Sequence, residues 1–285
     1  MAGFWDDLKL QFKMGDVTTK LIFWNVGIFL LSIPFFYQFK FGYFEYPQWL
    51  FLSSDGARAL THPWTLITYA FLHATFFHLL FNMIILNFSG RMFLTFFTQK
   101  QLLGLYILAA IFAALAFIAG YAIMGSTSSM VGASGAIMAV LLAVATCSPE
   151  MPIRLMLIGN LKLWHFAAFI VILDLMFILV ENTGGHIAHL AGAFFGFLYI
   201  KLLKSGTDLS KAVTSVTNLF SRGRSRQFKK VHKNYNPQPA KTVSRIVTKD
   251  KTQQQIDEIL DKISRSGYDS LTKEEKDFLF RAGKQ

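Results

Sequence analysis

The stretch Gly125–Val140, GSTSSMVGASGAIMAV, decides the fold class because it carries no charge and leads into an apolar segment that continues to Cys147. Such a segment is typical of a helix buried in lipid. Ser134 nevertheless lies beside Gly135 and two residues after Gly132, where the helix is expected to begin. The sequence therefore predicts a short membrane helix with a hydroxyl group at its polar start.

The remainder of the 285-residue chain has the same character, since 53% of it is apolar and it contains 30 Phe. This apolar share exceeds that of ordinary soluble domains. A spanning helix needs about 20 mainly apolar residues. The segments that meet this need, some marginally, are 21–37, 66–89, 102–124, 131–147, 163–180 and 186–203. The predicted fold class is all-α, a polytopic membrane protein with a six-helix bundle.

Lys and Arg are unevenly distributed among the predicted loops. They precede the first span and occur in the loops after the second and fourth spans, whereas 125–130 has no charge and 181–185 has only Glu181. Positively charged loops stay on the cytoplasmic side. We therefore expect both termini to be cytoplasmic and the starts of spans two, four and six to lie on the outer side.

Four regions follow from the composition. We expect a retained cytoplasmic segment at 1–20, a membrane domain at 21–204, a basic disordered linker at 205–251 and a helical hairpin at 252–285. Residues 201–251 hold thirteen Lys or Arg against Asp208 and Asp250, a pattern that favours anionic lipid over nucleic acid as the partner. Capping boxes at Thr252 and Thr272 predict the two hairpin helices, which either dock on a protein partner or order only on contact.

Polar side chains within predicted spans are functional candidates because burying them in lipid is costly. Those expected near the outer ends of spans two, four and six are His73, His78, Asn82, Ser134, His186 and His189. Asp174 is expected at the middle of the fifth span, deeper than His189, so we expect it to form a structural hydrogen bond.

Stripes of small residues indicate which spans meet. Gly135 and Ala139 on span four, and Gly192 and Gly196 on span six, would allow close contact and bring Ser134 toward His189. A serine becomes nucleophilic when a nearby imidazole takes its proton. The N–H of Ser134 and the side chains of Asn82 and His78 could stabilise an oxyanion. Together these residues predict acyl-transfer chemistry.

Other interpretations compete with acyl-transfer chemistry. Gly-x-Ser-Gly alone more often reflects packing, and a single histidine is more often structural. A zinc peptidase would carry the motif His-Glu-x-x-His, which is absent from the sequence. An aspartic protease site needs two carboxylates, and Asp174 is the only acid well inside a predicted span. The two halves of the chain show no repeat of the kind that many transporters have. We expect no metal and no cofactor.

Three motifs, HATFFHLLFN at 73–82, GASG at 132–135 and AHLAGAFFG at 188–196, resemble those of the rhomboid family of intramembrane serine proteases. The similarity covers about 21–203. It implies a Ser-His dyad that needs no acid, with Ser134 as nucleophile and His189 as base, and substrates that are transmembrane helices cut near the outer face. His78 and Asn82 match the oxyanion-stabilising positions, and Gly132 belongs to them as the glycine that lets the backbone approach the site. His73 matches a supporting histidine.

Two departures from the family pattern concern the first outer loop and the residue that packs on His189. Trp64-Thr65 replaces the usual Trp-Arg, and Met138 replaces an aromatic residue that packs on the histidine, so His189 is expected to be held less firmly. The final helices resemble an uncharacterised module of some bacterial rhomboid-like proteins, which implies a bacterial inner membrane. Relatives without the dyad bind membrane helices and do not cleave them, but this chain retains both Ser134 and His189.

Overall fold

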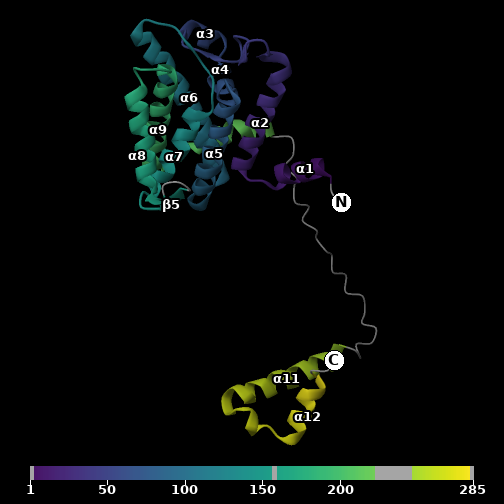
Figure 1. The fold of residues 1–285 in the computed structure, drawn as a ribbon. Helices are drawn as coiled ribbons and strands as arrows, with labels where there is room; N and C mark the ends of the chain where they lie inside the picture. Colours follow the sequence, from purple (N-terminus) through teal and green to yellow (C-terminus); the bar gives the residue numbers. More distant parts are fainter. Residues whose placement is uncertain (1–2, 156–158, 222–245, 283–285) are drawn as a thin grey trace. The chain divides into compact units, whose positions relative to one another are not determined.

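The computed structural model describes residues 3–155, 159–221 and 246–282. The chain forms two compact units, Met1–Ser225 and Arg226–Gln285, which are described separately. The longer helices of the first unit are α1 Phe4–Met14, α2 Val17–Phe36, α5 Phe76–Phe96, α6 Gln99–Met124, α7 Ser134–Cys147, α8 Leu163–Phe177, α9 Thr183–Lys204 and α10 Ser210–Ser221 (Figure 1). Short helical turns are α3 Gly56–Thr61, α4 Thr65–Thr68 and η1 Tyr69–Phe71.

Three short antiparallel strand pairs connect these helices. They are β1 Tyr37–Gln38 with β2 Tyr43–Phe44, β3 Leu52–Ser53 with β4 Ser129–Met130, and β5 Pro152–Leu155 with β6 Gly159–Lys162. The turns α3 and α4 lie at one end of the bundle and the β5 hairpin lies at the other (Figure 1). The two loop systems thus cover opposite ends of the helices.

The predicted all-α membrane bundle is confirmed. Helices α2, α5, α6 and α9 are long and apolar enough to cross a membrane, and α7 and α8 are shorter apolar helices. The second predicted span differs from the structure, because α5 begins only at Phe76, where Thr75 Oγ1 accepts a hydrogen bond of 3.1 Å from His78 N. His73 therefore lies in the segment before the helix rather than on it.

Helix α6 forms the centre of the bundle and packs against α7 and α9. Ala109, Ala110, Ala113 and Ala114 are fully buried along it, and Phe117 fills the space one turn further on. Small residues on a buried helix allow neighbouring backbones to approach, which is the usual mode of packing in membranes. The fold positions α7 and α9 against this surface.

Helices α7 and α9 touch backbone to backbone. A Cβ atom at Gly192 would overlap the carbonyl oxygen of Gly135, and one at Gly196 would overlap the carbonyl oxygen of Ala139. The contact predicted from the small-residue stripes is therefore confirmed. Gly135 also lies against α6, since a Cβ there would stand 3.0 Å from Ala113 Cβ.

The segment before α7 is fixed to the loop that precedes α5. Beside the β3–β4 pairing, Ser54 N donates to Ser128 O at 3.0 Å, and Gly132 N donates to Tyr69 O at 2.9 Å. The loop itself holds its shape without the arginine expected from the family. Trp64 Nε1 donates to Trp49 O and Thr65 Oγ1 donates to His62 O, both at 2.7 Å.

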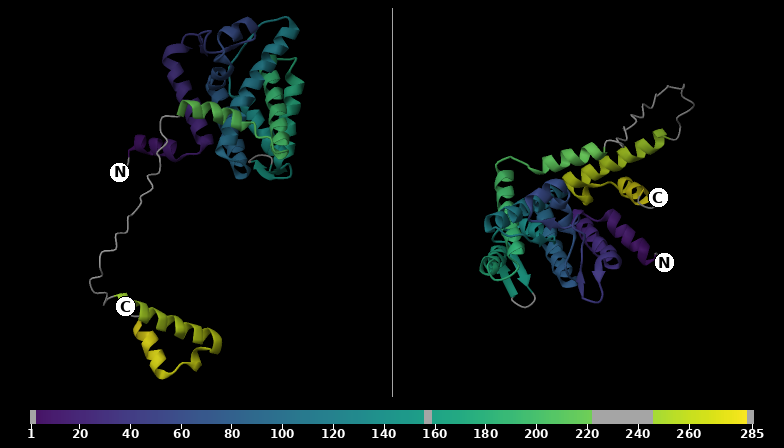
Figure 2. Two further views of the ribbon diagram at one scale, coloured as in Figure 1. Left: turned by 180° about the vertical axis from the view of Figure 1, so that it is seen from behind. Right: turned by 90° about the horizontal axis from the view of Figure 1, so that it is seen from above.

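The prediction of a disordered linker at 205–251 is wrong for Ser210–Ser221, which form α10. This helix runs across the bundle rather than along it (Figure 2) and contacts α6. Its start is fixed by Asp208, whose Oδ1 accepts from Ser210 N at 2.9 Å and whose Oδ2 accepts from Gln101 Nε2 at 3.2 Å. Gly104 makes room for Ser210, because a Cβ there would overlap it. Residues 222–245 of the predicted linker lie outside the described residues.

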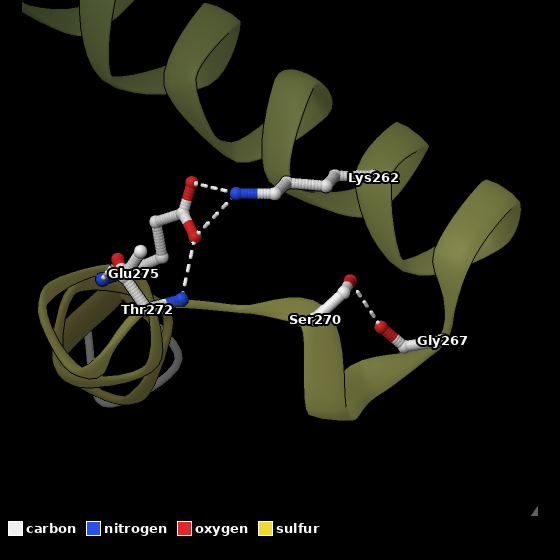
Figure 3. Close-up of polar contacts among 5 residues, drawn as sticks. All are labelled: Lys262, Gly267, Ser270, Thr272 and Glu275. Atoms are coloured by element: carbon white, nitrogen blue, oxygen red, sulfur yellow. Dashed lines mark hydrogen bonds and ion pairs between the residues drawn. The ribbon is translucent and has the colours of Figure 1, made fainter.

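The second unit contains α11 Ile246–Ser266, η2 Tyr268–Ser270 and α12 Lys273–Ala282. The capping box predicted at Thr252 is wrong, because α11 already begins at Ile246. The box at Thr272 is confirmed: Thr272 N donates to Glu275 Oε2 at 2.8 Å, and Glu275 N donates to Thr272 Oγ1 at 3.3 Å. Lys262 Nζ on α11 donates to both Glu275 carboxylate oxygens at 2.9 Å (Figure 3), which ties the two helices together.

The α7–α9 contact predicts a large effect for Gly192→Ala. Its methyl group would meet a backbone carbonyl that cannot rotate away, so we expect a loss of at least roughly 1–3 kcal/mol of stability. The measurement is the thermal unfolding midpoint of the detergent-solubilised chain. Gly27→Ala in α2 is the matched control, since no atom lies within 4 Å of its Cβ position. Equal midpoints for the two variants would contradict the packing account.

The Lys262–Glu275 pair predicts a lowered pKa. Hydrogen bonds from Lys262 and from Thr272 N hold the pKa of the Glu275 carboxyl below its ordinary value. The pair therefore stabilises the hairpin at neutral pH, and this contribution is lost as the pH falls through that lowered pKa. A carbon-detected NMR titration of the carboxyl group should show the pKa rising in Lys262→Met. No rise would show that the contact does not form in solution.

Candidate active site

Ser134 and His189 meet at the starts of α7 and α9. Ser134 is the first residue of α7, and its Oγ lies 2.7 Å from His189 Nε2. The other ring nitrogen, His189 Nδ1, lies 2.8 Å from Asp174 Oδ1 on α8. A hydroxyl, an imidazole and a carboxylate thus form one continuous chain of hydrogen bonds, the arrangement that activates a serine in hydrolytic enzymes.

The expectation that Asp174 lies deeper than His189 is wrong. Helix α8 ends at Phe177, so Asp174 falls in its last turn, and α9 begins at Thr183 with His189 two turns in. The two helices therefore bring both side chains to one level. The expected hydrogen bond of Asp174 does form, but its partners are the two histidines of α9, because His186 Nδ1 also lies 2.7 Å from Asp174 Oδ1.

Polar donors gather beside Ser134. The N–H of Ser134 belongs to the first turn of α7, whose N–H groups have no acceptor within the helix. Asn82 is 6% exposed, and its Nδ2 has no hydrogen-bond partner within the described part of the chain. Together with the half-buried His78, these groups border one cavity of about 930 Å³ that also reaches Ser134 and His189. The cavity can hold an extended peptide segment next to the hydroxyl.

Gly132 borders this cavity, and its lack of a side chain leaves space there. Its N–H donates to Tyr69 O, and the expected role of Gly132 at the oxyanion site stays a prediction. Its φ of 132° is one that side chains rarely adopt, and a Cβ atom would stand 2.8 Å from His78 Cε1. The glycine leaves room for the His78 ring.

His73 and Met138 flank the site without reaching the cavity. His73 is fully buried, and its ring meets the His78 ring edge to face with centroids 5.1 Å apart. Its carbonyl oxygen accepts from Tyr46 Oη at 2.9 Å. Met138 is buried on α7, one turn after Ser134, and its contact with His189 stays a prediction. Asp174 restrains the His189 ring directly, a contact that its expected depth in the fifth span did not predict.

Three potential metal ligands lie close together. Ligand atoms of Asp174, His186 and His189 are within 4.8 Å of one another. Two imidazoles that share one carboxylate oxygen account for this proximity by hydrogen bonding alone. Gly184 and Gly185 lie within α9 beside the site, and a Cβ at Gly184 would stand 2.6 Å from Phe117 Cε2.

The fold and the site together define a multi-pass membrane protein. A serine and a histidine meet near the starts of two closely packed helices, α7 and α9. The Rhomboid domain matches residues 60–206, which is just over half of the chain, and a family of unknown function, DUF6576, matches residues 247–284. The chain therefore belongs to the rhomboid family.

Curated relatives agree with this assignment. The chain is 31% identical over 157 residues to the human presenilin-associated rhomboid-like protein, mitochondrial, covering 53% of this chain and 40% of the relative. It is 30% identical over 190 residues to the Bos taurus protein of the same name, covering 64% and 47%. The chain thus matches less than half the length of each of these relatives.

The geometry around Gly132 predicts that Gly132→Ala lowers the thermal unfolding midpoint. An added methyl group would strain the backbone at positive φ and push His78 aside, at a cost of roughly 1–3 kcal/mol. Gly125→Asn is the matched control, because Gly125 also has positive φ (64°) but open space around it, and Asn tolerates that conformation. A midpoint for Gly132→Ala no lower than that of the control would contradict the account.

Proposed function

We propose that this rhomboid family member is a serine endopeptidase that hydrolyses peptide bonds in or near transmembrane helices of other membrane proteins. The observation that carries the proposal is the 2.7 Å contact between Ser134 Oγ and His189 Nε2 beside a cavity. A hydroxyl and an imidazole placed in this way can carry out nucleophilic catalysis, because the imidazole can take the hydroxyl proton as the oxygen attacks a carbonyl carbon.

The reaction proceeds in two steps. Ser134 Oγ attacks the carbonyl carbon of the scissile bond while His189 Nε2 takes the proton, and the tetrahedral oxyanion accepts hydrogen bonds from Ser134 N–H, Asn82 Nδ2 and the His78 ring. The carbon–nitrogen bond then breaks, and His189 gives its proton to the departing amine. Water, deprotonated by His189, hydrolyses the acyl-serine and restores the hydroxyl. No metal and no cofactor takes part.

The surroundings of the pair support cleavage within a membrane. Beside its apolar side chains, the cavity is lined by Ser128, Ser129, Asn182 and Thr183 as well as by the candidate residues, so it can hold water. Water-lined regions are where irregular backbone is tolerated at membrane depth. A substrate helix that unwinds into this cavity would present its carbonyl groups to Ser134.

The basic residues support an orientation and a location. Lys9 and Lys13 of α1, and Arg154 and Lys162 of the β5–β6 hairpin, lie at the bundle end opposite α3 and α4 (Figure 1), which supports the proposal that this end faces the cytoplasm. The proposed location is a bacterial inner membrane with both termini in the cytoplasm. The basic residues after α9 favour anionic lipid, and α11 with α12 offers a surface for a protein partner. The relatives are mitochondrial by name.

The test uses the detergent-solubilised full chain and a transmembrane substrate with a fluorescent reporter. The wild type should cleave this substrate, and Ser134→Ala should reduce cleavage to background. Within the described residues, no other hydroxyl group forms a hydrogen bond with His189 Nε2. The thermal unfolding midpoint serves as the control for folding. Equal cleavage by the variant would remove Ser134 from the mechanism, and capture of substrate without turnover by the wild type would favour a non-catalytic binder of membrane helices.

A further inference from the structure

His186 lies beside the catalytic pair but has no part in the reaction just described. Its Nδ1 is 2.7 Å from Asp174 Oδ1, and His189 Nδ1 is 2.8 Å from the same oxygen. The two histidines are three residues apart on α9, so both project toward α8, and their rings stand nearly perpendicular at 87°. One carboxylate oxygen therefore serves two imidazole groups.

This sharing leaves the second oxygen of Asp174 without a hydrogen-bond partner in the described part of the chain. Asp174 is 4% exposed, so water offers little compensation. Any partial rotation of the carboxylate away from this orientation would break both contacts at once. Two donors on Oδ1 hold the carboxylate in one orientation more firmly than His189 alone could.

His186 is itself held in place. Its ring stacks on Phe177 of α8 with an interplanar angle of 25° and centroids 6.4 Å apart. The ring is thus clamped between an aromatic side chain and a carboxylate that belong to the same helix. His186 therefore connects α8 and α9 through a fixed side chain, one helical turn before His189.

We propose that His186 is a positioning residue: it fixes Asp174 Oδ1 so that Asp174 holds His189 with Nδ1 protonated and Nε2 free to accept the Ser134 proton. The assignment rests on the proposed function. An imidazole base works only in this tautomer, and the partner of its second nitrogen selects it. His186 acts through Asp174 and does not touch the substrate.

The test measures kcat and KM of the full-length enzyme on the fluorescent transmembrane substrate. His186→Ala should lower kcat by roughly 10-fold and leave KM unchanged, because only the base is disturbed. His186→Asn should recover most of kcat, since its amide N–H can replace Nδ1–H. His165→Ala, which removes an exposed histidine from α8, is the matched control and should behave as the wild type.

A double-mutant cycle separates positioning from general stability. If His186 acts through Asp174, then His186→Ala should cause no further loss of kcat in an Asp174→Asn background. An equal loss in both backgrounds, or an unchanged kcat for His186→Ala, would overturn the proposal. Failure of His186→Asn to restore a folded but slow His186→Ala enzyme would also overturn it. A wild type without turnover would instead refute the protease itself.

Discussion

The backbone contact between α7 and α9 is the constraint on which the rest of the structure depends. Gly192 and Gly196 let the carbonyl groups of Gly135 and Ala139 approach to a distance that any side chain would prevent. Because Ser134 precedes Gly135 and His189 precedes Gly192 by one turn, this contact sets the separation between hydroxyl and imidazole. Helix α6 supports both partners from the other side with its buried alanines.

A second constraint is the placement of one carboxylate in an apolar bundle. Removing a charge from water is costly unless hydrogen-bond donors surround it, and Asp174 receives them from His186 and His189. The same contacts orient the His189 ring toward Ser134. The hydrogen bonds that offset the burial of Asp174 are therefore the same ones that shape the site of the proposed reaction.

Most of the bundle could be predicted from the sequence because lipid burial requires long apolar segments. The meeting of Ser134 with His189 could also be predicted, since small residues repeat at helical spacing on both segments. The position of Asp174 could not, because apolar residues continue to Val180 although α8 ends at Phe177. The hydrogen bond from Gly132 N–H to Tyr69 O likewise depends on a residue far away in the sequence.

Helix α10 lies in a segment whose polar composition predicted a disordered linker. The region after α9 is polar overall and basic in its later part, yet Val213, Val216 and Phe220 recur at helical spacing within it. The deciding contacts come from outside the segment: Gly104 leaves the space that Ser210 occupies, and Gln101 binds Asp208. A local pattern alone gave too little signal because the helix depends on α6 for its first turn.

The central claim is that His189 makes Ser134 a nucleophile, and covalent labelling tests it most directly. The full-length chain in detergent would be treated with a fluorophosphonate, and the modified residue would be located by peptide mass spectrometry. The account predicts an adduct on Ser134 in the wild type and its loss in a folded His189→Ala variant. Absence of the adduct in the wild type, or labelling of Ser134 at an equal rate in the variant, would contradict it.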